Sequence, residues 1–397
     1  MARQQRPVFV IGAGMIPFTK PGASAPYDAM GTQAARLALE DAGLAYDSVQ
    51  QAYVGYVYGD STAGQAAVYG AGLTGIPVFN VNNNCATGSS ALFLARQAVE
   101  SGVAECALAL GFEQMTPGAL KGKYDDRPSP VARFADTMTA LQGYDAHAPR
   151  AAQFFGGAGR AYMQEHGIRP DTFARISVKA RQHAARNPLA VFRDVLSLQE
   201  VMASPTVFDP LTRYQCCPPT CGAAAAVVCS EDFARRYKLD RRVRIAAQAM
   251  TTDTASTFES GDMRKLVGYD MTVSAASQVY EMAGIGPADV DVVELHDCFT
   301  ANELISYEAL GLTPEGTAER FILEGANTYG GRVVTNPSGG LLSKGHPLGA
   351  TGLAQCAELY WQLTGRAQQR QVEGARIALQ HNLGLGGACV VTLYQAA

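Results

Sequence analysis

Cys85 is the residue of this sequence best placed to act as a nucleophile. It lies in segment 82–90, between a strand-like pattern at 76–81 and a helical pattern with a plausible end at Gly102. A helix start offers unpaired backbone N–H groups and the positive end of the helix dipole, and both favour a thiolate. A buried structural cysteine is the alternative interpretation, so the residues around Cys85 must decide between the two.

Three further segments contain histidine together with cysteine or glycine. They are 294–299 with His296 and Cys298, 345–349 with His346, and the glycine-rich turn 381–387 with His381. Three of the six histidines of the chain lie in these segments. A single histidine at a strand end is usually structural, but loops at the carboxyl ends of parallel strands converge on one site. We therefore expect these segments to meet Cys85.

This set of groups predicts acyl-transfer chemistry. A thiolate attacks a thioester or ketone carbonyl and forms an acyl-enzyme. A neighbouring imidazole can take the thiol proton, and N–H donors can stabilise the oxyanion. A second thiol, whose ordinary pKa lies about one or two units above neutrality, suits proton transfer at a carbon acid. Together these groups indicate cleavage or formation of a carbon–carbon bond between acyl thioesters.

Metal binding is the other chemistry that cysteine and histidine could indicate. His296, Asp297 and Cys298 are consecutive, and neighbours on a strand point to opposite faces, so they rarely bind one ion. A second grouping consists of Cys216, Cys217, Cys221 and Cys229. Its spacing lacks paired Cys-x-x-Cys, and the apolar run 223–228 indicates a buried strand. We predict no metal. The remaining histidines are expected on the solvated surface: His147, His166 and His183.

The elements that would position these segments form two similar halves. Residues 32–51 and 273–292 share six identities at an offset of 241. Further matches follow in the same order: 86–88 with 350–352, strand pattern 106–110 with 377–380, and 222–223 with 387–388. Each match is weak alone, but the shared order predicts a duplicated α/β unit. Helices are expected at 32–43 and after Cys85.

The two halves differ by an insertion. The last two strand patterns nearly touch in the second half, whereas about a hundred residues separate them in the first. We predict an N-terminal half of 1–111 plus 215–232, an inserted loop domain of 112–214 and a C-terminal half of 240–397. The insertion is expected to form a separate cap over the first half.

Composition and charge exclude several classes of function. The net charge is −4 without a basic run, which argues against nucleic acid. No apolar run could cross a membrane, no signal peptide is apparent, and the nine cysteines are read as reduced thiols of a cytosolic protein. Gly12 and Gly14 begin a possible dinucleotide fingerprint, but Pro17 replaces its third glycine. We interpret these glycines as a tight turn and exclude a nicotinamide cofactor.

These segments resemble the thiolase superfamily, and within it the thiolase domain of sterol carrier protein X and its bacterial relatives. The resemblance covers essentially the whole chain and rests on 82–90, 296–299, 336–340, 345–352 and 380–387. It implies an α/β thiolase fold with duplicated βαβαβαββ halves in a five-layer αβαβα arrangement and an inserted loop domain. It also implies a homodimer or homotetramer with no tightly bound cofactor and with coenzyme A as a substrate, in addition to the cytoplasmic location expected above.

By this resemblance, Cys85 is the nucleophile that becomes acylated, and His346 activates it and donates to an oxyanion. Ordinary thiolases carry a second cysteine before the last glycine-rich turn, but His381 stands there in this sequence. Cys298 would therefore supply the acid–base thiol, as in the sterol carrier type.

The resemblance also implies two oxyanion holes. His296 would join His346 in one, and backbone N–H groups of Cys85, Leu383 and Gly384 would form the other. Segment 215–222 would face the pantetheine arm of coenzyme A, while no individual phosphate contact is assigned.

The predicted activity is that of a 3-oxoacyl-CoA thiolase of lipid metabolism, such as fatty acid β-oxidation. It would cleave a 3-oxoacyl-CoA with CoA through an acyl group on Cys85. The alternatives are a decarboxylating condensing enzyme, which does not need a second thiol, a retro-aldolase, and a noncatalytic lipid-binding scaffold. The length and branching of the acyl chain are not predicted.

Overall fold

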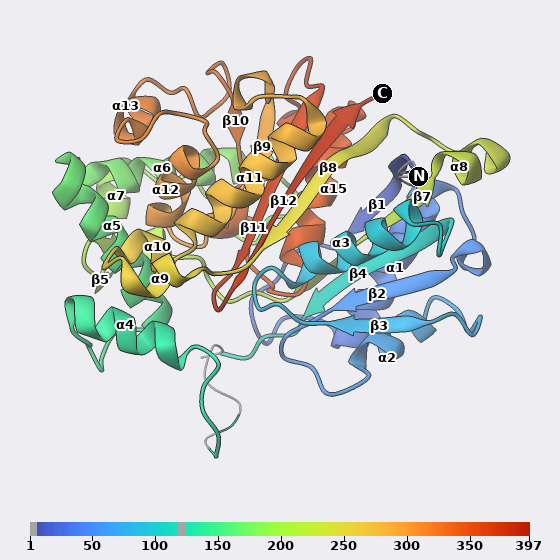
Figure 1. Ribbon diagram of the computed structural model, residues 1–397, viewed down its shortest axis with the longest axis horizontal. Coiled ribbons are helices and arrows are strands. Elements are labelled where there is room, and N and C mark those ends of the chain that lie inside the picture. The colour runs from blue at the N-terminus through green and yellow to red at the C-terminus, as the bar shows by residue number, and fades with distance from the viewer. Residues whose placement is uncertain (1–5, 118–123, 125) are drawn as a thin grey trace.

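One mixed β-sheet runs through the described part of this computed structural model, which covers residues 6–117, 124 and 126–397 (Figure 1). Its ten strands follow the order β10–β9–β11–β12–β8–β1–β7–β4–β2–β3. The strands of the first half are β1 (Val8–Met15), β2 (Gln51–Gly55), β3 (Val78–Val81), β4 (Cys106–Glu113) and β7 (Gly222–Ser230). Those of the second half are β8 (Val243–Thr251), β9 (Val292–Glu294), β10 (Val334–Thr335), β11 (Ile377–Gly384) and β12 (Ala388–Ala396).

The strand order confirms the predicted duplication. β2 lies parallel between β3 and β4, and β9 lies parallel between β10 and β11. In each half the next strand, β7 or β12, pairs antiparallel and is followed by the first strand of that half. The halves join edge to edge, because Phe9 and Val10 pair with Arg244 and Val243.

Helices form three layers around the strands. α1 (Tyr27–Ala42) packs on β1, β4 and β7, and α11 (Tyr269–Ala283) packs on β8 and β12. α3 (Thr87–Glu100) and α15 (Thr351–Leu363) contact each other and strands of both halves, so they form the middle layer. Nearly every residue of α15 is buried, as expected for a helix enclosed on all sides, and its polar side chains are hydrogen-bonded inside the protein. The five strands of each half form one layer, so together with the three helix layers they give the predicted five-layer α/β arrangement.

Shorter helices complete the two halves. They are α2 (Ala63–Tyr69), α8 (Glu231–Tyr237), α9 (Ala255–Glu259), α10 (Met263–Leu266), α12 (Thr300–Ala309), α13 (Ala318–Leu323) and α14 (Gly340–Ser343). The described part has no helix that combines the length and the apolar character needed to span a bilayer. All nine cysteines are free thiols.

The Gly12 and Gly14 positions are not a turn, so that prediction was wrong. Both lie within β1. A Cβ atom on Gly12 would lie 2.4 Å from the Ala38 carbonyl oxygen, and one on Gly14 would lie 2.5 Å from the Ala38 nitrogen. The glycines therefore let α1 approach the strand closely. The predicted end of α1 is confirmed, since Gly43 caps it in the left-handed conformation.

The insertion packs on the second half, which contradicts the predicted cap over the first half. Its elements are α4 (Ala132–Gln142), α5 (Arg150–His166), α6 (Asp171–Ala184), α7 (Leu198–Met202), β5 (Thr206–Phe208) and β6 (Leu211–Thr212). α5 contacts α10 and α12, and α6 contacts α12, α13 and α14 (Figure 1). The domain boundaries themselves stay a prediction.

Specific contacts explain this placement. The Phe155 ring stacks on Phe299 with centroids 4.9 Å apart, and buried Lys179 forms an ion pair with Glu303. His183 is only 2% exposed and hydrogen-bonds the Asn336 carbonyl, so its predicted surface position was wrong. These partners are more than a hundred residues away in sequence, and no local pattern of the insertion points to them.

Candidate active site

Cys85 lies on a strained turn between β3 and α3, as the sequence predicted. Asn84 precedes it with φ 51°, a conformation that non-glycine residues rarely adopt. Its amide donates to the Leu385 carbonyl at 2.9 Å, and the Thr87 hydroxyl donates to the Asn84 carbonyl at 2.6 Å. The surrounding hydrogen bonds therefore fix the turn that presents Cys85.

Three groups from separate segments converge at this turn. The Cys85 sulfur and one ring nitrogen each of His296 and His346 all lie within 4.8 Å of one another. The two imidazoles meet edge to face, with centroids 5.1 Å apart and planes at 83°. His296 follows β9, and His346 lies between α14 and α15. The structure thus brings together three of the four predicted side chains, and Cys85 is more than 200 residues away in sequence from either histidine.

Cys298, the fourth predicted residue, is a backbone neighbour of another cysteine, Cys217. Cys298 is 4% exposed, and its carbonyl accepts the Cys217 N–H at 2.9 Å. Burial raises the pKa of Cys298 well above its usual value, and negative charge on Cys217 or Cys85 raises it further. Cys85, Cys217 and Cys298 therefore lie within electrostatic range of one another.

Cys217 was not singled out, because segment 215–222 was expected to face the pantetheine arm without any role for an individual residue. β7 begins only at Gly222, and Cys217 belongs to the loop before it. Pro218 and Pro219 follow directly, and two prolines do not fit a central strand. The prolines were the available signal that Cys217 lies in a loop that can reach the site.

Segment 215–221 connects the insertion to β7 and contacts loops of the second half. Pro219 pairs with His346 as an isolated bridge, and the His346 N–H donates to the Thr220 hydroxyl oxygen at 2.6 Å. Cys221 is buried, and its sulfur contacts the Met115 nitrogen and oxygen at 3.2 and 3.3 Å. Cys221 therefore has a structural role in holding residue 115.

The site histidines are neutral. Burial, together with the Lys344 charge, lowers the pKa of His346 to about 3. Burial also lowers the pKa of His296 well below its usual value, with a further contribution from His346 and His381. Two uncharged imidazoles can act as one hydrogen-bond donor and one acceptor each.

The thiol of Cys85 is not stabilised as a thiolate, in contrast to the sequence expectation. Burial, followed by the charge of Glu113, raises the pKa of Cys85 to about 12. Desolvation therefore outweighs the helix start. A base must take the proton when Cys85 reacts.

Glu113 is a buried carboxyl group that the sequence analysis did not single out. It ends β4 and accepts N–H groups of Val57, Tyr58 and Gly349 at 2.9–3.0 Å. Burial raises its pKa to about 7, against the lowering effect of these hydrogen bonds. An acidic residue at the end of an apolar strand was the available signal. Glu113 links a first-half loop to the loop that follows His346.

His381 lies next to His296, whose N–H is directed at its Nδ1 at 3.5 Å, and is not one of the three groups that converge at the Cys85 sulfur. It belongs to β11, and its Nε2 is 3.1 Å from the Thr272 hydroxyl of α11. The predicted turn 381–387 is therefore shorter, since β11 continues to Gly384. A Cβ atom on Gly384 would lie 2.2 Å from the Asn83 carbonyl oxygen, so this backbone abuts the Cys85 turn. The oxyanion roles of Leu383 and Gly384 stay predictions.

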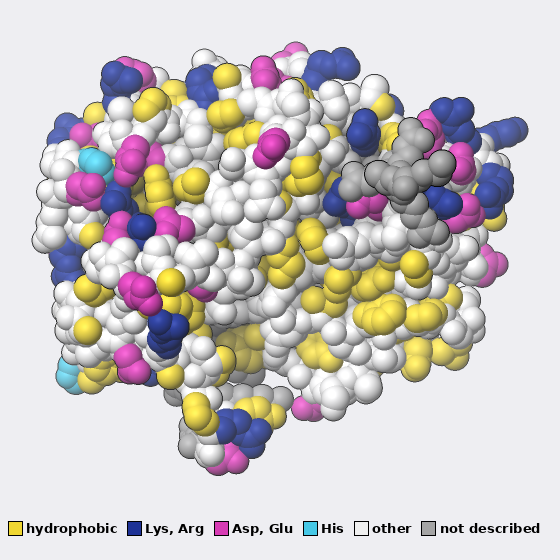
Figure 2. All heavy atoms as spheres, in the orientation of Figure 1, with side chains coloured by type: hydrophobic (Ala, Val, Ile, Leu, Met, Phe, Trp, Pro, Cys, Tyr) yellow, Lys and Arg dark blue, Asp and Glu magenta, His cyan; other side chains and the backbone are white. Residues whose placement is uncertain are grey.

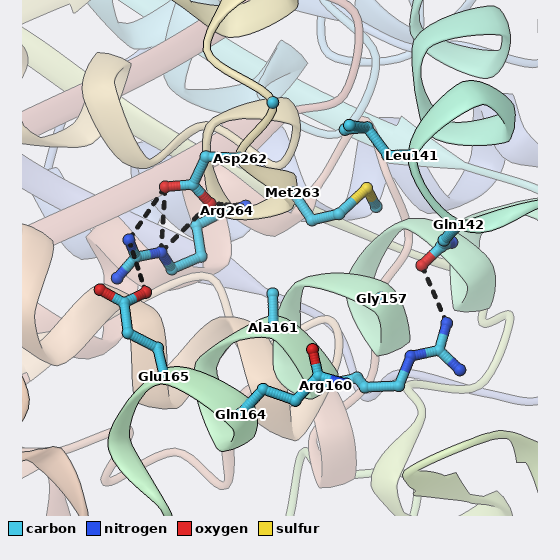
Figure 3. A pocket seen from close by; sticks show the side chains of 11 residues that line it. Leu141, Gln142, Gly157, Arg160, Ala161, Gln164, Glu165, Asp262, Met263 and Arg264 are labelled. Carbon is cyan, nitrogen blue, oxygen red and sulfur yellow. Dashed lines mark hydrogen bonds and ion pairs between the residues drawn. The ribbon is translucent and has the colours of Figure 1, made fainter.

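A cavity of about 600 Å³ lies away from this site, between the insertion and α10 (Figure 3). Arg264 on its wall is paired with Asp262 at 2.9 Å and Glu165 at 3.0 Å, and Arg160 donates to Gln142 at 3.1 Å. Because these arginines are already paired, the cavity offers little for the chemistry of Cys85.

Comparisons with known proteins agree with the fold and the site segments. The family model "Thiolase, N-terminal domain" matches residues 8–232, and "Thiolase C-terminal domain-like" matches 252–394. Human "Sterol carrier protein 2" is 56% identical over 98% of this chain and 72% of its own length. "Benzoylsuccinyl-CoA thiolase subunit BbsB" of Thauera aromatica is 35% identical over 96% of both chains.

Two solved structures share the fold. "Ltp2-ChsH2(DUF35) aldolase" aligns with a TM-score of 0.82 and 24% identity over 98% of each chain. "Crystal structure of human mitochondrial 3-ketoacyl-CoA thiolase in complex with CoA" aligns with a TM-score of 0.74 and 19% identity, over 99% of this chain and 98% of that one. With both family models matched and a relative more than half identical over 98% of this chain, this chain belongs to the thiolase family.

Proposed function

We propose that the protein is a 3-oxoacyl-CoA thiolase, an acyltransferase that carries the acyl group on Cys85. The observation that carries the proposal is the approach of the Cys85 sulfur to ring nitrogens of His296 and His346 within 4.8 Å. A thiol beside two neutral imidazoles, with further cysteines in the neighbouring loops, suits covalent acyl transfer coupled to carbon–carbon cleavage. A thiolase relative and a fold neighbour that was solved with CoA support CoA thioesters as substrates.

The proposed reaction begins when His346 takes the proton of Cys85. The thiolate attacks the 3-oxo carbonyl carbon, and the oxyanion that forms receives a hydrogen bond from an N–H donor. The bond between C2 and C3 then breaks, which leaves the acyl group on Cys85 and an enolate of acetyl- or propionyl-CoA. Cys298 protonates C2 of this enolate.

In the second half of the reaction, the thiol of free CoA attacks the acyl-enzyme. Its proton replaces the one that Cys298 gave up, and Cys85 regains the proton held by His346. The high pKa of buried Cys298 keeps it protonated between turnovers, as a proton donor must be. Segment 215–222 is proposed to lie along the pantetheine arm.

Separate assays for acylation and for carbon–carbon cleavage test these roles. With acetyl-CoA, mass spectrometry should find an acyl adduct on Cys85 in the wild type, in Cys298→Ala and in the control Cys217→Ala, but none in Cys85→Ala. Thiolysis of a 3-oxoacyl-CoA should fall about 10²–10⁴-fold in Cys298→Ala, because it lacks the proton donor. An adduct on Cys298 and none on Cys85 would overturn the assignment, and loss of thiolysis in Cys217→Ala alone would move the acid–base role to Cys217.

The same variants separate the alternative functions. A decarboxylating condensing enzyme should keep full activity with a malonyl thioester in Cys298→Ala. A retro-aldolase should still cleave its substrate in Cys85→Ala, and a scaffold should bind acyl-CoA without any covalent adduct. Acylation should also survive a chelator, because the mechanism uses no metal. A screen of 3-oxoacyl-CoA substrates that differ in length and 2-methyl branching would define the acyl chain.

We also propose that the chain forms a cytoplasmic homodimer or homotetramer through the outer edge of the first half. β3 ends the strand order, so its outer side pairs with no other strand of the described chain. Leu73, Tyr69 and Phe79 are 78%, 54% and 45% exposed, and Figure 2 shows apolar side chains gathered on this side of the molecule. Light scattering should give at least twice 42.0 kDa, and a monomer at micromolar concentration would contradict the proposal.

A further inference from the structure

The two histidines beside Cys85 have different partners at Nδ1. His296 Nδ1 lies 3.1 Å from the side-chain nitrogen Nδ2 of Asn382, and His346 Nδ1 lies 2.7 Å from the hydroxyl oxygen of Thr351. All four side chains are at most 6% exposed. A neutral imidazole carries its proton on one nitrogen only, and the partner at Nδ1 determines which.

For His296, the orientation of the Asn382 amide decides the tautomer. Asn382 Nδ2 also lies 3.1 Å from the Cys85 carbonyl oxygen, which can only accept, so Nδ2 is the donor on that side. The amide oxygen of Asn382 accepts the Ser89 hydroxyl at 2.8 Å. Because Nδ2 donates to His296 Nδ1, that nitrogen must carry a lone pair. The proton of His296 is therefore on Nε2.

A buried chain of hydrogen bonds holds the Asn382 amide in this orientation. Gln380 Nε2 donates to the Ser89 hydroxyl at 2.8 Å and to the Gly352 carbonyl at 2.6 Å. The Tyr394 hydroxyl donates to the Gln380 oxygen at 2.5 Å. A reversed Asn382 amide would bring its oxygen against the Cys85 carbonyl oxygen, where two acceptors face each other, and would deprive the Ser89 hydrogen of its acceptor.

For His346, the Thr351 hydroxyl favours the opposite tautomer to that of His296. It donates its single hydrogen to the Pro347 carbonyl oxygen at 3.0 Å, so toward the ring it can only accept. His346 Nδ1 therefore carries the proton, and Nε2 carries the lone pair. Within the described residues, this Nε2 is buried without a hydrogen-bond partner. Such an unpaired acceptor fits a base that waits for a proton.

We infer that Asn382 and Thr351 are positioning residues that hold the two neutral site histidines in opposite tautomers. His296 presents an Nε2–H donor, and His346 presents an Nε2 acceptor. The consequence for catalysis rests on the proposed function: His346 receives the Cys85 proton directly, and His296 donates to the oxyanion without a change of charge. The site thus has its donor and its acceptor before substrate arrives.

The tautomers can be measured in the resting protein without any substrate. Two-dimensional ¹H–¹⁵N NMR of protein labelled with ¹⁵N-histidine distinguishes Nδ1–H from Nε2–H, and His296→Asn and His346→Asn assign the signals. We expect Nε2–H for His296 and Nδ1–H for His346. The opposite tautomer at either ring would overturn the inference, even if acylation of Cys85 were observed. Failure of acylation with the expected tautomers would instead contradict the proposed function alone.

Asn382→Asp tests the positioning role, because it replaces the NH₂ donor by an acceptor oxygen of equal size. His296 Nδ1 should then become protonated. Asn187→Asp is the matched control: this buried amide donates to the Ser338 carbonyl at 2.8 Å and accepts the Leu189 N–H at 3.0 Å, without a histidine partner. It should leave the His296 signals unchanged. An unchanged His296 tautomer in Asn382→Asp would refute the role of Asn382.

Kinetics should show that Asn382 acts through His296. Asn382→Asp should lower kcat about 10²–10³-fold, as expected for loss of an oxyanion donor, and should add nothing further in a His296→Ala background. An equal additional loss in that background would mean that Asn382 acts by another route. Likewise, Thr351→Val should release the His346 tautomer and slow iodoacetamide alkylation of Cys85 about tenfold or more, whereas Thr351→Ser should restore both.

Discussion

At the scale of single residues, burial decides the acidity of the nucleophile. The pKa of Cys85 is about 12, so at neutral pH only about one thiol in 10⁵ is ionised. The start of α3 lies directly after it but does not overcome desolvation and the nearby Glu113 carboxylate. Cys85 can still react from its thiol form, because the neutral imidazole of His346 takes the proton during the attack. No thiolate needs to be present in the resting protein.

Glu113→Gln should therefore lower the pKa of Cys85. The carboxyl group of Glu113 ionises near pH 7, so the variant and the wild type should differ mainly above pH 7, where the wild-type charge opposes the thiolate. The measurement is the pH dependence of Cys85 alkylation by iodoacetamide in a Cys217→Ala background. Glu113→Asp, which keeps the charge, is the control. Coincident pH profiles for Glu113→Gln and wild type would contradict this electrostatic role.

The site residues that were predicted from the sequence differ from those that were not in the elements that position them. Cys85, His296 and His346 follow predicted strand or helix boundaries, so the expected topology was enough to bring them together. Cys217 arrives on a loop whose path depends on the packing of the insertion. Asn382 lies inside a recognised motif, but its importance follows from the direction of hydrogen bonds, which side-chain types alone do not fix.

At the scale of elements, the paired central helices bring the two halves of the site together. A Cβ atom on Gly88 of α3 would lie 2.8 Å from the Gly349 carbonyl oxygen. One on Gly352 of α15 would lie 2.2 Å from the Ser89 hydroxyl oxygen and 2.3 Å from its backbone nitrogen. The repeated Ala-Thr-Gly is thus explained by close contact between the starts of α3 and α15. The sequence repeat predicted these helices but could not show that they touch.

Gly352→Ala should separate the Cys85 and His346 loops. The added methyl group meets backbone atoms, which cannot move like a flexible side chain, so we expect a loss of about 1–3 kcal/mol in the free energy of unfolding. Acylation of Cys85 should also slow. Gly286→Ala serves as the control, because its nearest neighbour would be the Asp289 carboxylate at an ordinary 3.7 Å. Urea denaturation would test this, and equal stabilities of the two variants would contradict the close contact.

At the scale of the whole molecule, the two halves share one topology, but equivalent turns in them have different roles. The equivalent strands β3 and β10 are each followed by an asparagine with φ 51°, Asn84 and Asn336. The first turn presents Cys85, whereas the carbonyl of the second accepts a hydrogen bond from His183 of the insertion. The repeat in the sequence predicted the matching strand order. It could not predict that the insertion occupies the second turn, because that choice depends on contacts distant in sequence.

Docking of the insertion through His183 should make stability depend on pH. Burial, with the nearby Lys179 charge, lowers the pKa of His183 to about 3. A group whose pKa is lowered on folding contributes stability above its unfolded pKa, about 6.5, and loses it as the pH falls toward 3. At pH 5 the loss should be about 2 kcal/mol. Glu113 and Asp297 act oppositely, because burial raises the pKa of both carboxyl groups.

A comparison of wild type with His183→Asn isolates this histidine from the opposing carboxyl groups. Asparagine can keep the donor to the Asn336 carbonyl but does not titrate. Urea unfolding at pH 7.5 and pH 5 gives the stability difference between the two proteins at each pH. The wild-type advantage should shrink by about 2 kcal/mol at pH 5, because only the wild type must keep a neutral imidazole buried. An advantage that stays constant over this range would contradict the lowered pKa, because His183 would then take up its proton in the folded protein as readily as in the unfolded one.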